Sequence, residues 1–495
     1  MMTRSFWRCW HISLCRRLNW SEEGMMRVAL VGGGLTGLAA AYYLEQYYPN
    51  VTMDLFEAGD QLGGWVRTDT DHDIVLEKGP DSFLATKPDL VELCEKVGLG
   101  PHLIGTNPRV RGAYVFWRDR YYPIPDGIQT GVPTKAKPVL TSPLLSLTGK
   151  IALAKDFIMS KGPTTDQSLG HFLRRRFGNQ IVDRLAAPML SGIFAGDIDQ
   201  MSLKATFPHL LAAEQQARSV YLGSKRRIPP APNEFVQRYH SAFLTVDRGL
   251  EQIIHSLAAA LSRTQVLLSE PVERIEPASH QKWSVISAKR QGEYDAVIMT
   301  IPAYASAQIL AFLPHEAQTI LQNIPYANLA VIGAAYDPAD IPVKTDKTGF
   351  LVPKQAGLRM TAVTWVSSKW HYPHVAPLFV LRAFYGRSTE NILEYDDDTL
   401  TQLFYREIER TMHIQQPPKY LRVFRIPKGM PQYAVGHLER IAELHQYLAH
   451  FPGLFVLGAF EGGVGMPDRV KQAKDMAQTF GQQMGLSTAE YETSS

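Results

Sequence analysis

The residues with the clearest capacity for chemistry are the glycines of the run Gly32-Gly33-Gly34-Leu35-Thr36-Gly37. In a G-x-G-x-x-G turn the first glycine makes the turn, the second lets backbone approach a pyrophosphate, and the third lets helix and strand pack closely. The amino end of the following helix then stabilises the phosphate charge. Glu57 stands twenty positions after Gly37, where a carboxylate can accept hydrogen bonds from both ribose hydroxyls. This pattern predicts a dinucleotide site, although Glu57 alone is equally explained as the end of an edge strand.

A second glycine pair follows this carboxylate in the run Gln61-Leu62-Gly63-Gly64-Trp65-Val66-Arg67-Thr68, and Gly458–Pro467 is again rich in glycine. Both runs resemble motifs of the amine-oxidase-type flavoprotein superfamily, and the resemblance implies that the dinucleotide is FAD rather than NAD. In that superfamily, backbone amides of the second run meet the pyrimidine end of the flavin, where they stabilise negative charge on reduction. The cofactor-binding residues that the turn and the resemblance imply are Gly32, Gly33, Gly34, Leu35, Thr36, Gly37, Glu57, Ala58, Gly63, Gly64, Trp65, Arg67, Gly79, Pro80, Asp81, Ser82, Val272, Ala459, Val464, Gly465 and Met466.

Further runs go beyond cofactor binding. They are Glu77–Leu84 (EKGPDSFL), Leu190–Asp197 (LSGIFAGD), Met430–Tyr433 with Gly436-His437, and Phe460–Asp468. These runs are similar to the protoporphyrinogen and coproporphyrinogen oxidase family, and Asp166–Gly170 and Ser202–Pro208 are similar to its soluble, Gram-positive-type branch. The similarity extends from Arg27 to about Gln482.

The resemblance implies an FAD-dependent, O₂-dependent oxidase of heme biosynthesis. Its reaction would be the six-electron oxidation of coproporphyrinogen III to coproporphyrin III, with release of H₂O₂. Protoporphyrinogen IX stays open as the alternative substrate, because no composition or spacing distinguishes four propionates from two. Remoter alternatives are a flavin amine oxidase and a non-catalytic porphyrin carrier.

Basic residues are candidates for holding the propionates, because arginine suits bidentate carboxylate binding. The resemblance places Arg111 at a substrate-carboxylate arginine of the family, and Lys87 where the soluble branch often has a basic residue. Lys204 and Arg382 are weaker candidates. For each of them, an ordinary surface charge is the alternative.

Three other residues are candidate neighbours of the macrocycle. Gly192 would let backbone approach the tetrapyrrole, and Leu351 and Trp365 would form apolar walls, with a turn or ordinary core packing as alternatives. No catalytic acid or base is assigned, because hydride loss from a carbon between electron-rich pyrroles leaves a delocalised cation that needs no strong base. The protein then supplies binding, orientation and exclusion of competing reactions.

Short apolar runs must position these motifs. Arg27–Val31 reads as a strand, a helical pattern runs from Leu35 to about Tyr48, and Val51–Glu57 reads as a second strand. Ala296–Thr300 and Leu454–Leu457 are predicted to join the same sheet. We therefore predict an α/β fold, in which a discontinuous Rossmann-like FAD-binding domain carries an inserted β-rich substrate domain and an inserted helical lobe. The predicted ranges are 25–103, 245–302 and 425–495 for the FAD-binding domain, 104–109, 215–244 and 303–424 for the substrate domain, 110–214 for the helical lobe, and 1–24 for an extension outside the fold.

Composition narrows the class further. A formal net charge of +3, from 51 basic and 48 acidic residues, gives no support for a nucleic-acid partner. The run Arg174-Arg175-Arg176 is predicted to be a solvated helix face, or part of a rim that attracts anions. The three cysteines form no disulfide or metal-ligand pattern, and no apolar run approaches the ~18 residues of a membrane-spanning helix. We expect a cytoplasmic protein whose partners are a porphyrinogen and O₂, with peripheral membrane contact and oligomeric state left open.

Overall fold

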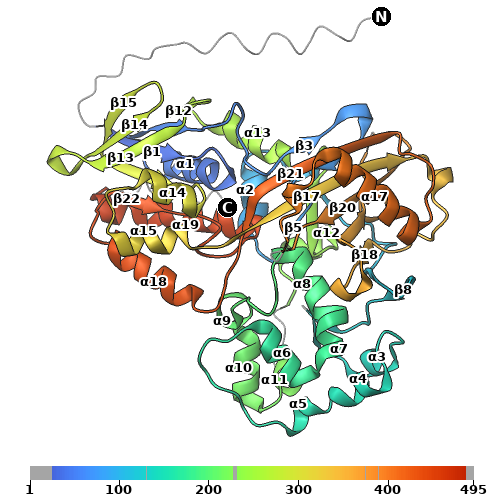
Figure 1. The fold of residues 1–495 in the computed structure, drawn as a ribbon. Coiled ribbons are helices and arrows are strands. Elements are labelled where there is room, and N and C mark those ends of the chain that lie inside the picture. Colours follow the sequence, from blue (N-terminus) through green and yellow to red (C-terminus); the bar gives the residue numbers. More distant parts are fainter. Residues whose placement is uncertain (1–24, 130, 227–230, 374, 388–389, 487–495) are drawn as a thin grey trace, which may run out of the picture.

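The computed structural model describes residues 25–486, except 130, 227–230, 374 and 388–389 (Figure 1). The extension predicted at residues 1–24 lies outside the described residues. The described chain forms a parallel α/β region, a large sheet beside it, and a helical lobe that projects from both (Figure 1). Among the described residues, no helix is both long enough and apolar enough to span a bilayer.

A five-stranded parallel sheet carries the first glycine turn. Its strand order is β12 (Thr264–Leu267), β2 (Val51–Phe56), β1 (Met26–Val31), β16 (Ala296–Met299) and β22 (Leu454–Val456). Alternate residues of β1 enter different cores: Val28 and Leu30 face one side of the sheet, and Ala29 and Val31 face the other. Because both faces are buried, these strands are continuous apolar runs, which is the pattern that made them predictable.

Helices and a small sheet cover the two faces of the parallel sheet. One face is covered by α1 (Leu35–Tyr47), α2 (Asp89–Lys96), α13 (Glu251–Ala260) and α19 (Met466–Met484). The other is covered by β13 (Val272–Pro277), β14 (Trp283–Ser287), β15 (Gln291–Tyr294), α14 (Ala303–Ile309), α15 (His315–Gln322) and α18 (His437–Leu448).

A seven-stranded sheet forms the second region. Its order is β21 (Tyr420–Pro431), β17 (Tyr326–Tyr336), β20 (Phe379–Tyr385), β19 (Met360–Trp365), β18 (Gly349–Leu351), β7 (Tyr114–Trp117) and β8 (Arg120–Pro123). All neighbouring strands are antiparallel except β18 and β7. Helix α17 (Asp397–Met412) packs on one face through Leu400, Phe404 and Ile408.

Shorter elements connect the two sheets. They are β3 (Thr68–Asp69), β4 (Leu76–Glu77), β5 (Phe83–Leu84), β6 (Leu103–Gly105), β9 (Ile128–Gln129), β10 (Val132–Pro133), β11 (Phe243–Val246), α12 (Glu234–Tyr239) and α16 (Val366–Lys369). Strand β11 lies between β5 and β6 in a three-stranded sheet. On the face of β17 opposite α17, Gly333 packs against Leu76 of β4. The contact is so close that a Cβ at position 333 would lie 2.3 Å from the Leu76 side chain.

The helical lobe is built from short helices around an apolar core. Its helices are α3 (Ala136–Thr141), α4 (Leu147–Ala152), α5 (Lys155–Ile158), α6 (Leu169–Phe177), α7 (Asn179–Ile181), α8 (Ala187–Phe194), α9 (Leu203–Thr206), α10 (Pro208–Ala217) and α11 (Val220–Arg226), with a π-helical turn at Val182–Ala186. Several elements lie outside their predicted ranges. Strands β7 and β8 and the end of β21 belong to the seven-stranded sheet, α14 and α15 cover the parallel sheet, and α11 packs on α10 within the lobe, where Gly223 contacts the Ala213 backbone. The division into three domains is kept as a proposal with these changes.

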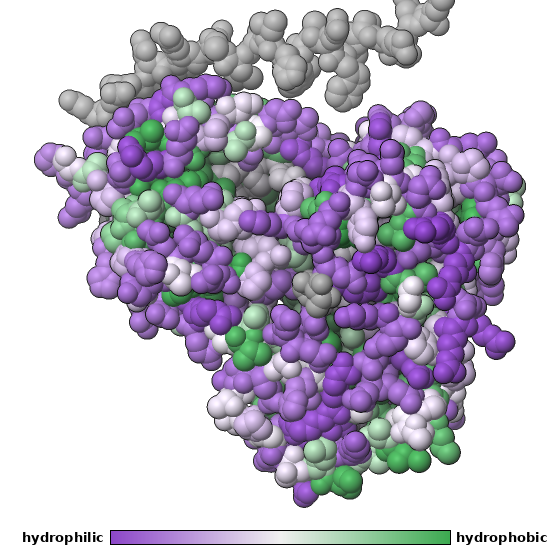
Figure 2. All heavy atoms as spheres, viewed as in Figure 1, coloured by the Kyte–Doolittle hydropathy of each residue, from purple (hydrophilic) through white to green (hydrophobic). Residues whose placement is uncertain are grey.

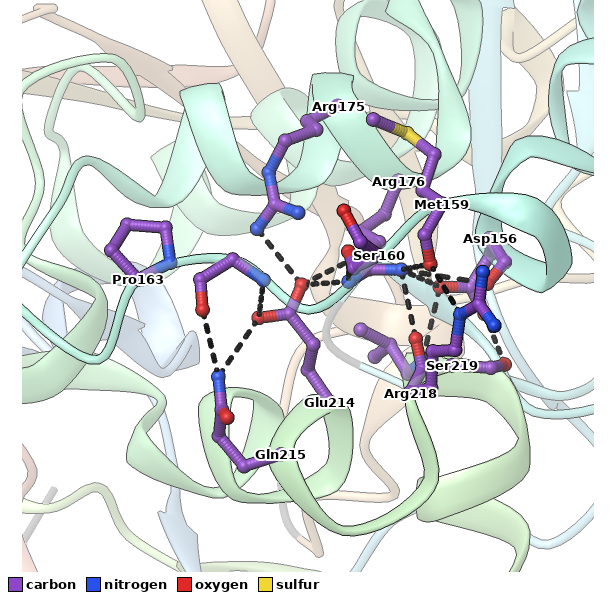
Figure 3. A network of polar contacts seen from close by, with 12 residues as sticks. Asp156, Met159, Ser160, Pro163, Arg175, Arg176, Glu214, Gln215, Arg218 and Ser219 are labelled. Atoms are coloured by element: carbon purple, nitrogen blue, oxygen red, sulfur yellow. Dashed lines mark hydrogen bonds and ion pairs between the residues drawn. The ribbon is translucent and has the colours of Figure 1, made fainter.

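The arginine run of α6 is not the solvated face that the sequence predicted. The side chain of Arg176 is fully buried and forms an ion pair with buried Glu214, which Arg175 also contacts at 2.8 Å (Figure 3). The Arg176 guanidinium also donates to the carbonyl oxygens of Ser160 (2.8 Å) and Arg218 (2.9 Å). The prediction was wrong because partners far away in sequence supply the acceptors that make burial of this charge possible.

Buried Asp156 extends this network to α11 (Figure 3). Its carboxylate lies 3.7 Å from Arg176 and accepts hydrogen bonds from the Ser219 hydroxyl (2.6 Å) and from the N–H groups of Val220 (3.0 Å) and Tyr221 (2.9 Å). An acidic side chain at a helix amino end satisfies N–H groups that otherwise lack a partner. The network therefore joins α5, α6, α10 and α11.

Candidate functional site

The first glycine turn joins β1 to α1. A Cβ at Gly37 would lie 2.0 Å from the carbonyl oxygen of Gly32, so only glycine fits where the helix passes the turn. Leu35 and Thr36 are buried, whereas a Cβ at Gly34 would meet nothing within 4 Å. No side chain caps the start of α1. The amino end of α1 therefore faces open space, where its first N–H groups can bind an anion.

Glu57 follows β2 and is held in place by backbone. One carboxylate oxygen accepts the Gly33 N–H and the other accepts the Gly59 N–H, each at 2.8 Å. A carboxylate has about four acceptor positions, so lone pairs remain for ribose hydroxyls. Ala58 is exposed beside Glu57, and buried Val272 begins β13 close by, since Glu270 donates its N–H to the Glu57 carbonyl at 2.9 Å.

The second glycine pair lies directly against the first turn. Gly63 donates its N–H to the Gly33 carbonyl at 2.8 Å and forms a bridge with Gly34. A Cβ at Gly64 would find the Gly34 Cα, 3.8 Å away, as its nearest neighbour. The indole of Trp65 is 43% exposed, which makes an apolar surface available next to the turn.

Arg67 braces this turn from within the protein. Its guanidinium donates to the carbonyl oxygens of Gln61 (3.1 Å) and Gly64 (3.3 Å), and forms an ion pair with Glu251 at 3.3 Å. Glu251 in turn accepts the Thr68 N–H at 2.9 Å. The structure thus places this predicted cofactor residue as a support of the glycine pair.

Two carboxylates lie near the end of β4: Glu77 is the last residue of the strand, and Asp81 lies in the following loop, Gly79–Ser82. Their pKa values are shifted in opposite directions. Glu77 is buried and accepts hydrogen bonds from the Thr68 hydroxyl (2.8 Å) and the Leu250 N–H (2.7 Å), yet its burial raises its pKa to about 8. Asp81 lies 2.9 Å from the Lys369 ammonium and accepts the Ser82 hydroxyl at 2.8 Å. Burial opposes ionisation of Asp81, but the charges of Lys369 and then Arg382 outweigh it and lower the pKa to about 2.

The carboxyl-terminal glycine loop is fixed by Tyr433 and His437. The Tyr433 hydroxyl donates to the Ala459 carbonyl and accepts the Gly463 N–H at 2.9 Å. The His437 ring stacks on Tyr433 with centroids 4.5 Å apart, and its Nε2 bonds the Phe460 carbonyl at 2.7 Å. Burial raises the pKa of Tyr433 to about 12 and lowers that of His437, so both rings are neutral supports near pH 7.

Helix α19 begins at the end of this loop. Gly465 is its N-cap residue, no side chain caps the helix, and Met466 is its first, buried residue. Val464 is half-buried beside them. As at α1, the amino end of the helix presents backbone N–H groups to the site.

The remaining family-like runs meet around this loop. The Asp166 carboxylate accepts the N–H groups of Gly436 (2.9 Å) and Lys204 (3.1 Å) and the Ser202 hydroxyl (2.7 Å). The Gln432 side chain donates to the Phe194 carbonyl at 2.9 Å. The helical lobe and the carboxyl-terminal region are thus joined through residues of these runs.

The structure brings some of the substrate candidates together. A Cβ at Gly192 of α8 would lie 4.0 Å from half-buried Leu351 of β18, so these two residues face one another. Arg111 is exposed just before β7, and its guanidinium has no hydrogen-bond or ion-pair partner within the described residues. Lys87 instead forms an ion pair with Asp468 at the start of α19, with distances of 2.6 and 2.7 Å.

Trp365 does not line a surface. It is fully buried in the core of the seven-stranded sheet, where its ring lies within 6.2 Å of the rings of Tyr114, Tyr121 and Phe350. A tryptophan at a strand end gives no sequence signal that separates a core ring from a binding wall. We leave Trp365 out of the proposed substrate site.

Sequence reasoning missed two supports of the site. Lys369, after β19, pairs with Asp81 at 2.9 Å, and its serine-rich surroundings (Ser367-Ser368-Lys369-Trp370) gave no pattern that marks a partly buried cation. The Thr300 hydroxyl, at the end of β16, is within reach of the Val31 and Gly32 carbonyls, at 3.0 and 2.9 Å. Thr300 directly follows β16, a strand parallel to β1, and this position could have indicated that its side chain lies near the glycine turn.

The donor set fits FAD. Two uncapped helix amino ends, at α1 and α19, suit a pyrophosphate and a reduced flavin ring, and Glu57 suits a ribose. No group of three or more His, Cys, Asp or Glu side chains in the described part of the chain is arranged to hold a metal ion.

Comparison with known proteins agrees with this geometry. Residues 35–479 match the family model described as flavin containing amine oxidoreductase. The chain is 34% identical to coproporphyrinogen III oxidase of Bacillus subtilis (92% of this chain, 97% of the relative) and 31% identical to that of Staphylococcus aureus (91% and 98%). Protoporphyrinogen oxidase of Bos taurus is 26% identical (91% and 97%).

Solved structures show the same fold. A crystal structure from Exiguobacterium sp. 255-15, provisionally assigned as a protoporphyrinogen oxidase, has a TM-score of 0.83 and 33% identity, covering 93% of this chain and all of the other. Cyclohexylamine oxidase from Brevibacterium oxydans IH-35A, with a TM-score of 0.64 and 16% identity over 93% of this chain and all of the other, shares the fold alone.

Proposed function

Since the chain belongs to the family of flavin-containing amine oxidoreductases, we propose that it is an FAD-dependent oxidase that converts coproporphyrinogen III to coproporphyrin III. The balanced reaction consumes one O₂ and releases one H₂O₂ for each two-electron step. Six electrons leave the substrate in three such steps.

One observation carries the proposal. Runs from three distant parts of the chain, at Leu190–Asp197, Met430–Tyr433 and Phe460–Asp468, are linked around one glycine loop by hydrogen bonds. A fourth run, Gly79–Ser82, packs on the turn of the second glycine pair. These runs are the ones that resemble porphyrinogen oxidases, so their meeting beside the flavin site supports a porphyrinogen as the electron donor. Relatives named coproporphyrinogen III oxidase, at 34% and 31% identity, favour that substrate over protoporphyrinogen IX.

The residues of this chain bind and orient the substrate and support the flavin site. When bound, FAD supplies the acceptor of the hydride and passes electrons on to O₂. We propose that the exposed Arg111 guanidinium binds a propionate, and that Leu351 and the backbone at Gly192 contact the macrocycle. Met466 and Gly465 present the amino end of α19, where positive backbone partial charge favours the reduced, negatively charged flavin.

The test is aerobic turnover by the purified full-length protein. We expect bound FAD, formation of a fluorescent porphyrin, and three H₂O₂ for each coproporphyrin III formed. Anaerobic incubation is the matched control, in which the flavin should be reduced and bleach, and no porphyrin should accumulate, since one bound flavin accepts only two of the six electrons. A flavin-loaded protein that yields no peroxide in air would rule out the oxidase, and peroxide produced from primary amines alone would favour an amine oxidase.

We also propose that this enzyme is cytoplasmic and makes peripheral contact with membranes through the far end of the helical lobe. Figure 2 shows apolar surface gathered at that end. The exposed apolar side chains there are Leu140 (45%), Leu147 (74%), Ile151 (64%), Phe157 (50%) and Ile158 (72%). Exposed Lys137, Lys155 and Lys161 lie on or beside the same helices, and cations next to apolar side chains suit an anionic bilayer surface.

Vesicle sedimentation tests this surface. We expect the protein to sediment with vesicles containing phosphatidylglycerol and much less with pure phosphatidylcholine. The double variant Leu147→Glu/Ile158→Glu should stay in the supernatant. Leu438→Glu on α18, which changes another exposed leucine (42%), is the control that should still sediment. Equal behaviour of the two variants would remove the lobe as the contact.

A further inference from the structure

Arg382 of β20 is a buried cation in the middle of the seven-stranded sheet. Its side chain is 1% exposed, and it points off the sheet towards the loop Gly79–Ser82 of the parallel α/β region. One guanidinium nitrogen donates to the Gly79 carbonyl at 2.5 Å, and another lies 3.7 Å from Asp81. This placement does not suit the propionate contact for which Arg382 was a weak candidate, because the group has no access to solvent.

The position of Gly79 is determined from two sides. A Cβ at Gly79 would lie 2.1 Å from the carbonyl oxygen of Trp65, so the loop packs directly on the glycine-pair turn. Arg382 holds the Gly79 carbonyl from the other side. A shift of Arg382 would therefore move a loop that is in contact with Trp65.

The charge of Arg382 is balanced locally. Burial lowers the pKa of Arg382, whereas the charges of Asp81 and then Glu77 raise it. Asp81 is shared with Lys369, whose ammonium also lies 3.3 Å from the Ser82 hydroxyl. An apolar replacement of Arg382 would leave Asp81 paired with Lys369 and would remove the donor that holds the Gly79 carbonyl, so the loop would lose one of its contacts with the sheet.

We propose that Arg382 is a positioning residue that couples the substrate sheet to the flavin site, by fixing Gly79–Ser82 against the turn Gly63–Trp65. The inference rests on the proposed placement of these two segments at the flavin. Displacement of a reacting group by about 1 Å can cost about 100-fold in rate even when the mutated residue is remote from the chemistry. Arg382 therefore acts through the loop and touches neither reactant.

The test compares Arg382→Met, Arg382→Lys and Arg410→Met, each purified with bound FAD. Arg410 pairs with Asp119 on the surface of α17 and is the control for loss of an ion pair. We expect Arg382→Met to change the visible absorption spectrum and midpoint potential of the bound flavin and to lower kcat about 100-fold with little change in KM. Arg382→Lys should restore part of each property, and Arg410→Met should match the parent protein.

Two outcomes overturn the inference. A folded Arg382→Met protein with the parental flavin spectrum, potential and kcat excludes a positioning role. If Arg382→Met does not fold, Arg382→Lys decides, since it keeps the charge and removes the guanidinium that donates to the Gly79 carbonyl. A parental spectrum and potential in that variant then excludes the role. Both flavin measurements need no porphyrinogen, so they stay informative if the proposed substrate is wrong.

Discussion

The Lys87 ammonium lies 2.6 and 2.7 Å from the two carboxylate oxygens of Asp468, the third residue of α19. A predicted substrate cation is therefore neutralised by an acidic residue beside the loop that would meet the flavin. A substrate propionate would have to compete with Asp468 for the Lys87 ammonium. The pair is better explained as cancelling the Asp468 charge next to the flavin.

Replacement of Lys87 by methionine is expected to lower the midpoint potential of bound FAD. The uncompensated Asp468 carboxylate would disfavour the negative charge that the flavin gains on reduction. The double variant Lys87→Met/Asp468→Asn should return the potential towards the parental value. Spectroelectrochemical titration of the three proteins checks this, and an unchanged potential in Lys87→Met would show that the pair lies too far from the flavin to matter.

Replacement of Arg111 by alanine is expected to raise KM for coproporphyrinogen III about tenfold, which corresponds to ~1.4 kcal/mol of lost binding. Little change is expected in kcat or in thermal stability, because Arg111 is exposed and has no partner within the described residues. Arg109→Ala, two positions away and also exposed, is the control. Steady-state kinetics that are equal for the two variants would remove Arg111 from the site.

Replacement of Arg176 by methionine is expected to lower the free energy of unfolding by about 3–5 kcal/mol, because it leaves buried Asp156 without its cation and buried Glu214 with Arg175 alone. Arg174→Met removes a partly exposed member of the same run and is expected to cost much less. Urea denaturation followed by circular dichroism measures both. Equal losses would mean that burial of the Arg176 network does not set the stability of the lobe.

The free energy of unfolding is expected to depend on pH in part through the buried Glu77 carboxyl group. Its pKa is about 8 in the folded protein and 4.5 when unfolded, so the folded state binds more protons between these values and stability falls as pH rises through that window. The contribution is fully present below pH 4.5 and is lost above about 8. Glu77→Gln should remove this part of the slope, about 1.4 kcal/mol per pH unit at most. Parallel stability curves for the two proteins would contradict the assignment.

The cofactor half of the fold was the most predictable part. The strands of the parallel sheet are continuous apolar runs because helices or a second sheet cover both faces. Glycine is required at position 37 because a Cβ there would lie 2.0 Å from the Gly32 carbonyl oxygen. Because these requirements act between residues that are close together in the chain, they can be recognised in the local sequence. The predicted strands and the glycine turn therefore agree with the structure.

Ion pairs between residues that are far apart in the chain could not be predicted from the sequence. Arg176 looked like a surface charge because its partners, Glu214 and Asp156, come from other helices. Similarly, nothing next to Lys369 or Arg382 indicates that each pairs with Asp81, about three hundred positions away. Trp365 failed as a candidate wall because a strand has the same local pattern whether its end faces a ligand or a core.

The most direct test of the central claim is turnover of coproporphyrinogen III and protoporphyrinogen IX by the same flavin-loaded protein in air, with kcat/KM measured for each. We expect coproporphyrinogen III to be preferred at least tenfold, with three H₂O₂ for each porphyrin, since its additional propionates offer Arg111 more carboxylates to bind. A clear preference for protoporphyrinogen IX would contradict the substrate assignment while leaving the flavin oxidase chemistry in place.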